Sequence, residues 1–313
     1  MCFLVIKQLV VMMLIAVSGF AVTRFFKFGM AEQRFVSKVL IYFINPCLIF
    51  SRFDMPFDSS RLKAFFIVLL IAVIIHLVMI AVSLVFIRPV QNDEAGLYQI
   101  DRLGVVFTNC GFIGIPLIDG IFPGTDGVFY LLPFIVTFNV FLWIFGYKSF
   151  CGRVNLKKLI TNPNIISVLL GILLFCLPFK LPYVISTPVK SIAGMNTAMA
   201  MFLLGMLFAN FHGFNSSYIS RIIKLCLVRF VVVMIFSLAI CFAVFRILSS
   251  MPDIRLICYV CYIASLCPVG MSVSSFAVLF EKDESYAGLC VLATSILCVI
   301  TLPLSVALAG LLF

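Results

Sequence analysis

Apolar runs long enough to cross a lipid bilayer fill most of this sequence. A membrane-spanning helix needs about 20 predominantly apolar residues. Ten runs of roughly this length, bounded by charged and turn-forming residues, lie at 2–22, 35–51, 64–87, 103–122, 127–147, 163–179, 185–209, 222–248, 254–280 and 286–312. The 313 residues are 64% hydrophobic and 11% charged, whereas soluble domains are roughly 45–50% apolar and about 25% charged. The sequence therefore predicts an all-α integral membrane protein with ten transmembrane helices in a lipid bilayer.

The basic residues predict the orientation of these spans. Of the 22 Lys and Arg residues, 14 fall with the loops that follow odd-numbered spans and 8 fall on the opposite side. Loops rich in Lys and Arg face the cytoplasm. We therefore expect a multi-pass protein of the cell (inner) membrane with both termini extracytoplasmic. The net charge of +10 is spread over short loops, so no nucleic-acid partner is expected.

Two charged residues inside apolar runs need separate interpretation. Lys7 lies within the first run and no basic segment precedes it, so this run is interpreted as a span and not as a signal peptide. Arg229 lies one or two turns inside the eighth span. Long basic side chains near the ends of membrane helices reach toward the interface, and we expect Arg229 to extend to the cytoplasmic surface.

The sequence contains no pattern typical of an enzyme, a metal site or a cofactor site. The 12 cysteines are scattered, and the CxxC pair Cys258 and Cys261 lacks the further ligands that a structural zinc ion needs. The two histidines are His76 and His212, and no GxSxG, HExxH or Walker-type loop occurs. His76 lies near the centre of the third span, where it is either a functional group or a neutral side chain bonded to a neighbouring helix.

The ten spans divide into two halves of five. Residues 1–150 form the first expected repeat, residues 151–162 a basic cytoplasmic linker, and residues 163–313 the second repeat. Because each half has an odd number of spans, the second enters the membrane inverted relative to the first. Inverted repeats with broken helices at matching positions are typical of secondary transporters.

Helix-breaking residues occur in the fourth span of each half. The expected site residues are Asn109, Gly111, Gly114 and Pro116 in the fourth span, and Pro268, Gly270, Ser272 and Ser274 in the ninth. Proline removes a backbone donor, and glycine permits the conformations that an unwound segment requires. If the two breaks meet near the midplane, they expose helix N-termini that carry partial positive charge. We expect an anion to bind there without a fixed cation.

Several motifs along the chain are similar to those of one transporter family. They are INPCLIF at 44–50, NCGFIGIPL at 109–117, NPNIISVLLG at 162–171, AMAMFLLGMLFA at 198–209, PVG at 268–270 and LPL at 302–304. These stretches resemble the auxin efflux carrier family, which includes the plant PIN-FORMED carriers and bacterial relatives and falls in the bile acid/sodium symporter-like superfamily. The long cytoplasmic loop of the plant carriers is absent, and Val269 stands where many relatives have Asn or Gln.

The resemblance implies a permease for small organic anions such as mono- or dicarboxylates. It also implies a static bundle of spans one, two, six and seven, a moving bundle of the other spans, and substrate held where the fourth and ninth helices cross. The implied transport motion resembles an elevator, and the implied assembly is a homodimer. The sequence leaves the substrate, the direction of flux and any coupling ion open. The alternatives are a ligand-binding membrane sensor of the same fold without net transport, and an ion channel.

Overall fold

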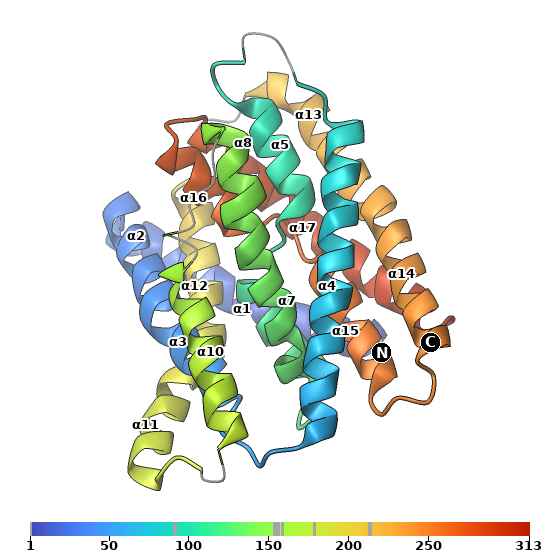
Figure 1. Cartoon of the computed structure of the whole chain (residues 1–313). Coiled ribbons are helices and arrows are strands. Elements are labelled where there is room, and N and C mark those ends of the chain that lie inside the picture. The colour runs from blue at the N-terminus through green and yellow to red at the C-terminus, as the bar shows by residue number, and fades with distance from the viewer. Residues whose placement is uncertain (1, 90–92, 153–156, 158–159, 178–179, 212–214) are drawn as a thin grey trace.

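A computed structural model of the chain describes residues 2–89, 93–152, 157, 160–177, 180–211 and 215–313. Within these residues the regular structure is helical (Figure 1). In chain order the elements are α1 (Cys2–Phe26), α2 (Met30–Val39), η1 (Leu40–Ile44), α3 (Asn45–Ser51), α4 (Ser59–Phe86), α5 (Leu97–Val106), η2 (Cys110–Gly114), α6 (Ile115–Ile121), α7 (Gly127–Phe141), η3 (Leu142–Gly146), α8 (Tyr147–Cys151), α10 (Pro163–Cys176), α11 (Tyr183–Gly194), α12 (Asn196–Ala209), η4 (Ser216–Tyr218), α13 (Ile219–Leu227), η5 (Val228–Val233), α14 (Met234–Ile247), α15 (Ile254–Leu266), α16 (Met271–Leu279) and α17 (Glu284–Ala309). Half of the linker 151–162, namely residues 153–156 and 158–159, lies outside the described residues, as does His212.

The apolar helices coincide with the predicted spans. Seven helices in the described part of the chain are long and apolar enough to cross a membrane, namely Phe3–Phe26, Met30–Ser51, Ser59–Phe86, Gly127–Cys151, Tyr183–Ala209, Ser216–Ile247 and Glu284–Ala309. They match the first, second, third, fifth, seventh, eighth and tenth predicted spans. The sixth is the shorter helix α10, and the fourth and ninth are interrupted. These helices support the prediction of an all-α, multi-pass membrane protein.

Local sequence explains where α10 begins. Asn162 precedes Pro163, which occupies the first helical position, where its missing amide hydrogen costs nothing. The Asn162 Oδ1 atom accepts hydrogen bonds from the backbone amides of Asn164 at 2.9 Å and Ile165 at 3.3 Å. The Asn-Pro-Asn motif is therefore a helix N-cap.

Two of the helices contain a wide π-turn directly before a proline. The π-turn η1 leads into Asn45 and Pro46, and the π-turn η2 leads into Ile115 and Pro116. A proline ring clashes with the carbonyl four residues earlier, and one turn of π-helix relieves that clash without ending the helix. The expectation that Gly111, Gly114 and Pro116 form the break in the fourth span is therefore wrong, because the helix is interrupted earlier, at 107–109.

The helices pack in two groups. In the first group α1 packs on α12, and α3 packs on α10 and α11. In the second group α4 packs on α5 and α7, α15 packs on α7 and α14, and α16 packs on α17 (Figure 1). Helix α1 also packs on α6 and α17 of the second group, so it lies at the junction. We call the first group the static bundle and the second the moving bundle, the names that the family resemblance implies for these spans.

Two glycines allow α1 and α12 to approach closely. A Cβ atom at Gly19 would overlap the carbonyl oxygen of Phe202, and a Cβ atom at Gly205 would overlap the carbonyl oxygen of Ala16. Small residues at helix interfaces are typical of membrane proteins, because close backbone approach increases the van der Waals contact that holds the helices together. Gly205 belongs to the motif at 198–209. Because its backbone is helical, a conformation open to any residue, glycine is needed there only for its lack of a side chain.

Replacing Gly205 with alanine is expected to destabilise the static bundle. The added methyl group meets backbone atoms, which cannot move aside as a flexible side chain would. Overpacking of this kind costs about 1–3 kcal/mol. Thermal unfolding of the purified protein in detergent should show a lower Tm for Gly205→Ala. The matched control is Gly194→Ala, since a Cβ at Gly194 meets nothing within 4 Å. Equal Tm values for the two variants would contradict the prediction.

Candidate functional site

The interruptions in the fourth and ninth spans lie directly against each other. The chain is non-helical at 107–109, between α5 and η2, and at 267–270, between α15 and α16. Thr108 and Val269 form an isolated antiparallel bridge. The amide of Asn109 donates to the carbonyl of Pro268 at 2.7 Å, and the amide of Gly270 donates to the carbonyl of Phe107 at 2.9 Å. We call this pair of segments the crossing.

Glycine is required at one position of the crossing. A Cβ atom at Gly270 would lie 2.9 Å from the carbonyl oxygen of Thr108 and 3.0 Å from the Ser272 Oγ atom. The first of these atoms belongs to the backbone of the opposite segment and is held by the bridge. Gly270 therefore permits the two chains to approach within hydrogen-bonding distance, as glycine does wherever backbones come close.

The guanidinium group of Arg229 binds the carbonyl ends of both broken helices. Its Nη1 atom donates to the carbonyls of Gly104 and Val105, each at 3.0 Å. Its Nη2 atom donates to the carbonyl of Ser265 at 3.4 Å and to that of Cys267. Carbonyls at the C-terminal end of a helix lack intrahelical donors and carry partial negative charge. Arg229 supplies both the donors and the compensating charge.

A threonine from the tenth span completes this arrangement. The Thr294 Oγ1 atom accepts a hydrogen bond from the amide of Val269 at 3.0 Å and donates to the carbonyl of Cys290 at 2.7 Å. In hydrocarbon each unsatisfied backbone group costs several kcal/mol. Several of the amides and carbonyls that the two interruptions release are thus bonded to each other, to Arg229 and to Thr294.

The structure corrects two expectations about charge. Arg229 does not extend to the cytoplasmic surface, because its side chain is fully buried behind the crossing. The expectation of a crossing without a fixed cation is also wrong, because Arg229, which belongs to η5 in the eighth span, binds carbonyls of both interrupted helices there. An ionisable residue inside an apolar span is a functional candidate by default, and this signal was present in the sequence.

Polar atoms without partners remain at the crossing. The Nδ2 atom of Asn109, the Oγ atom of Ser272 and the Nε atom of Arg229 are buried and have no hydrogen-bond partner among the described residues. Asn109 is only 4% exposed. Buried donors of this kind are rare in native structures and each needs an explanation. Asn109 and Ser272 also lie at the starts of the two half-helices, Cys110–Ile121 and Met271–Leu279.

The structure brings some of the predicted site residues to the crossing and leaves others away from it. Gly114 lies at the crossing, where a Cβ would be 3.5 Å from the Sγ atom of Cys267, and Gly111 is half-buried with open space beside it. Pro116 lies further along the helix, and its carbonyl accepts a hydrogen bond from Gln8 of α1. Ser272 and Ser274 are two residues apart on one helix, so they do not share a face. Ser274 therefore does not point where Ser272 points.

The His76 side chain is buried and packs among aromatic rings. Its Nδ1 atom lies 2.8 Å from the carbonyl of Ala72 on its own helix, and because a carbonyl can only accept, Nδ1 carries the proton. The ring stacks on Phe141 at 5.6 Å and packs against Phe134 at 4.8 Å. These contacts give His76 a packing role between α4 and α7.

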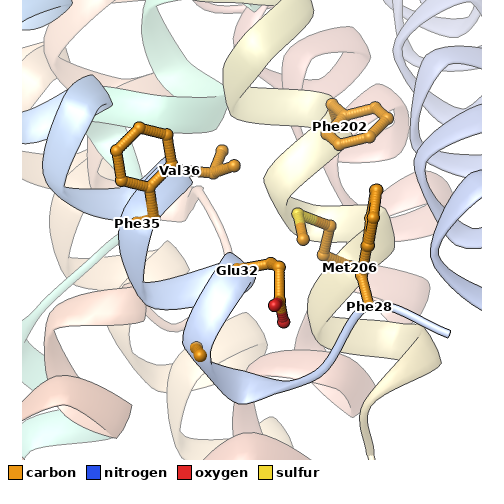
Figure 2. A pocket seen from close by; sticks show the side chains of 7 residues that line it. Phe28, Glu32, Phe35, Val36, Phe202 and Met206 are labelled. Carbon is orange, nitrogen blue, oxygen red and sulfur yellow. The ribbon is translucent and has the colours of Figure 1, made fainter. Parts of the chain in front are cut away.

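A hollow at the surface of the static bundle lies apart from the crossing. Figure 2 shows its lining, in which Phe28, Phe35, Val36, Phe202 and Met206 surround Glu32. Its volume is about 450 Å³. The Glu32 carboxylate already accepts a hydrogen bond from the amide of Gly29 at 2.8 Å and so caps α2. The lining is otherwise apolar, and no polar group without a partner points to a ligand for this hollow.

Comparison with known proteins assigns the chain to a family. A family model described as membrane transport protein matches residues 4–155 and 148–306. Together these matches cover nearly the whole chain, including both interrupted spans. No protein of curated function matches the sequence.

Proposed function

Because the chain belongs to the membrane transport protein family that includes the auxin efflux carriers, it is a membrane transporter, and we propose that its substrates are small organic anions such as mono- or dicarboxylates. In this proposal the substrate binds at the crossing of the fourth and ninth helices. The chain forms ten spans in two inverted repeats, and the moving bundle carries the site across the membrane past the static bundle.

The observation that carries this proposal is the convergence of positive charge and unpaired donors at the crossing. Two half-helices begin there, and the N-terminus of a helix attracts anions through its free amides and its partial charge. Asn109 adds an unpaired amide donor and Ser272 an unpaired hydroxyl. Arg229 adds a full positive charge behind the crossing. A carboxylate supplies the acceptor oxygens and the negative charge that these groups lack.

The packing of the helices supports an elevator-type motion. The crossing is formed by helices of the moving bundle alone, so it can travel as a unit without losing its internal hydrogen bonds. The static bundle is held by the close approach at Gly19 and Gly205. Motion of one bundle past the other then changes only the contacts at their junction. A homodimer formed through the static bundle belongs to the same proposal.

Uptake into proteoliposomes tests the substrate class. We expect purified protein to exchange radiolabelled carboxylates from a panel of mono- and dicarboxylic acids, and to exchange neutral and cationic compounds of similar size no faster than empty liposomes. Gly270→Ala is the matched inactive control, because its added methyl group forces the crossing apart. Binding of a carboxylate without exchange would indicate a sensor, and exchange of cations in place of anions would reject the proposal.

A further inference from the structure

One face of the half-helix Cys110–Ile121 is bound to the static bundle. The Nε2 atom of Gln8, on α1, donates to the carbonyl of Pro116 at 3.0 Å. The guanidinium of Arg52, at the end of α3, donates to the carboxylate of Asp119 at 3.1 Å. Pro116, Asp119 and Gly120 are spaced by three and four residues, so they lie on the same face of the helix.

The Gln8 carboxamide packs on this face because Gly120 has no side chain. A Cβ atom at Gly120 would overlap the carboxamide of Gln8. Gln8 itself is half-buried on the α1 stripe that buries Val5, Leu9 and Met12. A polar side chain on an otherwise apolar stripe needs a partner, and here the partner is a backbone carbonyl of the opposite bundle.

The second contact is weaker but lies on the same helix. The side chains of Arg52 and Asp119 are 32% and 51% exposed, and ion pairs this open to solvent contribute little. The contact of Gln8 is more enclosed, and its acceptor is fixed in the backbone. Both contacts join the static bundle to the helix that carries Asn109 at its start.

We propose that Gln8, seated against Gly120 and assisted by Arg52, is a latch that holds the moving bundle in the position seen here. Gln8 is thus a positioning residue for the transport site, because it fixes the helix that presents Asn109. This proposal rests on the proposed motion of one bundle past the other. Movement of the crossing requires the bond from Gln8 to Pro116 to break and the Gln8 carboxamide to leave Gly120.

Two variants remove the latch by different routes. Gln8→Ala deletes the donor. Gly120→Ala keeps both hydrogen-bonding groups but places a methyl group where the Gln8 carboxamide lies, and that flexible side chain can swing away without moving the backbone. Ser18→Ala is the matched control, since the Ser18 hydroxyl bonds the carbonyl of Ile15 on its own helix.

Hydrogen–deuterium exchange of the full-length protein in detergent measures the latch without requiring a known substrate. In peptides covering residues 110–121 we expect exchange to be about three- to tenfold faster in Gln8→Ala and in Gly120→Ala, and unchanged in Ser18→Ala. Alanine is a better helix former than glycine. If Gln8 were not a latch, Gly120→Ala should therefore stabilise the helix and slow its exchange. Faster exchange in this variant therefore reports the lost contact and not a weaker helix.

The double variant and a charge reversal complete the test. Gln8→Ala combined with Gly120→Ala should exchange no faster than the more affected single variant, because both changes remove one contact. Arg52→Asp should speed exchange slightly, and Arg52→Asp with Asp119→Arg should restore it. Unchanged or slower exchange in either Gln8→Ala or Gly120→Ala, or additive effects in the double variant, would overturn the latch.

The outcome for the latch is separable from that for the proposed function. Faster exchange in both variants, with no carboxylate transported by the wild-type protein, would leave the contact standing and reject the proposed substrate class. Transport by the wild-type protein, with exchange unchanged in the variants, would reject the latch alone. If both proposals hold, Gln8→Ala should change the turnover rate more than the affinity for the carboxylate, since Gln8 lies outside the anion site.

Discussion

Arg229→Met is expected to destabilise the crossing and abolish transport. Methionine has a similar length but donates no hydrogen bond, so the carbonyls of Gly104, Val105 and Cys267 would remain buried without donors. Each unsatisfied buried group costs about 1–3 kcal/mol, and the total is expected to reach about 4 kcal/mol. Thermal unfolding in detergent should therefore show a Tm lower by about 10 °C.

Two further variants show whether this effect depends on the guanidinium group. Arg229→Lys keeps the charge but presents a compact ammonium in place of a planar fork, so it should recover only part of the stability. Arg246→Met removes an exposed arginine from the last turn of α14 and should leave the Tm close to that of the wild type. A wild-type Tm for Arg229→Met would show that the carbonyls find other donors.

Asn109→Asp is expected to abolish anion binding, and Asn109→Ala to weaken it about ten- to hundredfold. A hydrogen bond to a charged partner contributes about 1.5–3 kcal/mol, and each 1.4 kcal/mol is a factor of about ten in affinity. Aspartate removes the unpaired Nδ2 donor and also places a negative charge opposite the substrate. The measurement is direct binding, to purified protein, of a carboxylate that the proteoliposome panel identifies.

Thr137→Val provides the matched control for Asn109. The Thr137 hydroxyl is buried in the moving bundle, but it bonds the carbonyl of Pro133 on its own helix and takes no part in the crossing. Its replacement by an isosteric apolar residue should leave carboxylate affinity unchanged. Wild-type affinity in Asn109→Asp would mean that the Asn109 side chain does not face the anion.

The all-helical, membrane-spanning architecture was predictable from the sequence because the membrane restricts the choice of structure so strongly. In hydrocarbon a chain must satisfy its own backbone groups, and a helix does so within each apolar run. The predicted span at 64–87 accordingly corresponds to α4 at Ser59–Phe86, and the span at 286–312 to α17 at Glu284–Ala309. The Asn162 cap is local in the same sense, since its Oδ1 atom bonds the amides two and three residues later.

The position of the break in the fourth span was not predictable from helix-breaking residues. Pro116 has an alternative to a break, because the π-turn at Cys110–Gly114 absorbs its clash. The interruption falls instead at 107–109, where pairing with 268–270 provides backbone partners. A non-helical segment at this depth is stable only if another segment forms hydrogen bonds with it. Which segment does so depends on the tertiary packing and cannot be read from the amino-acid sequence.

By itself the sequence determined the lipid environment and the apolar helices, since these follow from apolar length. Its proline and glycine residues marked the fourth and ninth spans only as candidates for an interruption. Only the tertiary structure decided which groups bond the backbone carbonyls and amides that the irregular segments release. Arg229 is eight residues from Arg221 in sequence, yet Arg221 pairs with Asp101 at 2.7 Å while Arg229 binds the carbonyls behind the crossing. Gln8 likewise finds its acceptor 108 residues away. Such partners depend on which helices pack together, because a buried donor or charge is stabilised by whatever group lies within reach, not by its neighbours in the chain.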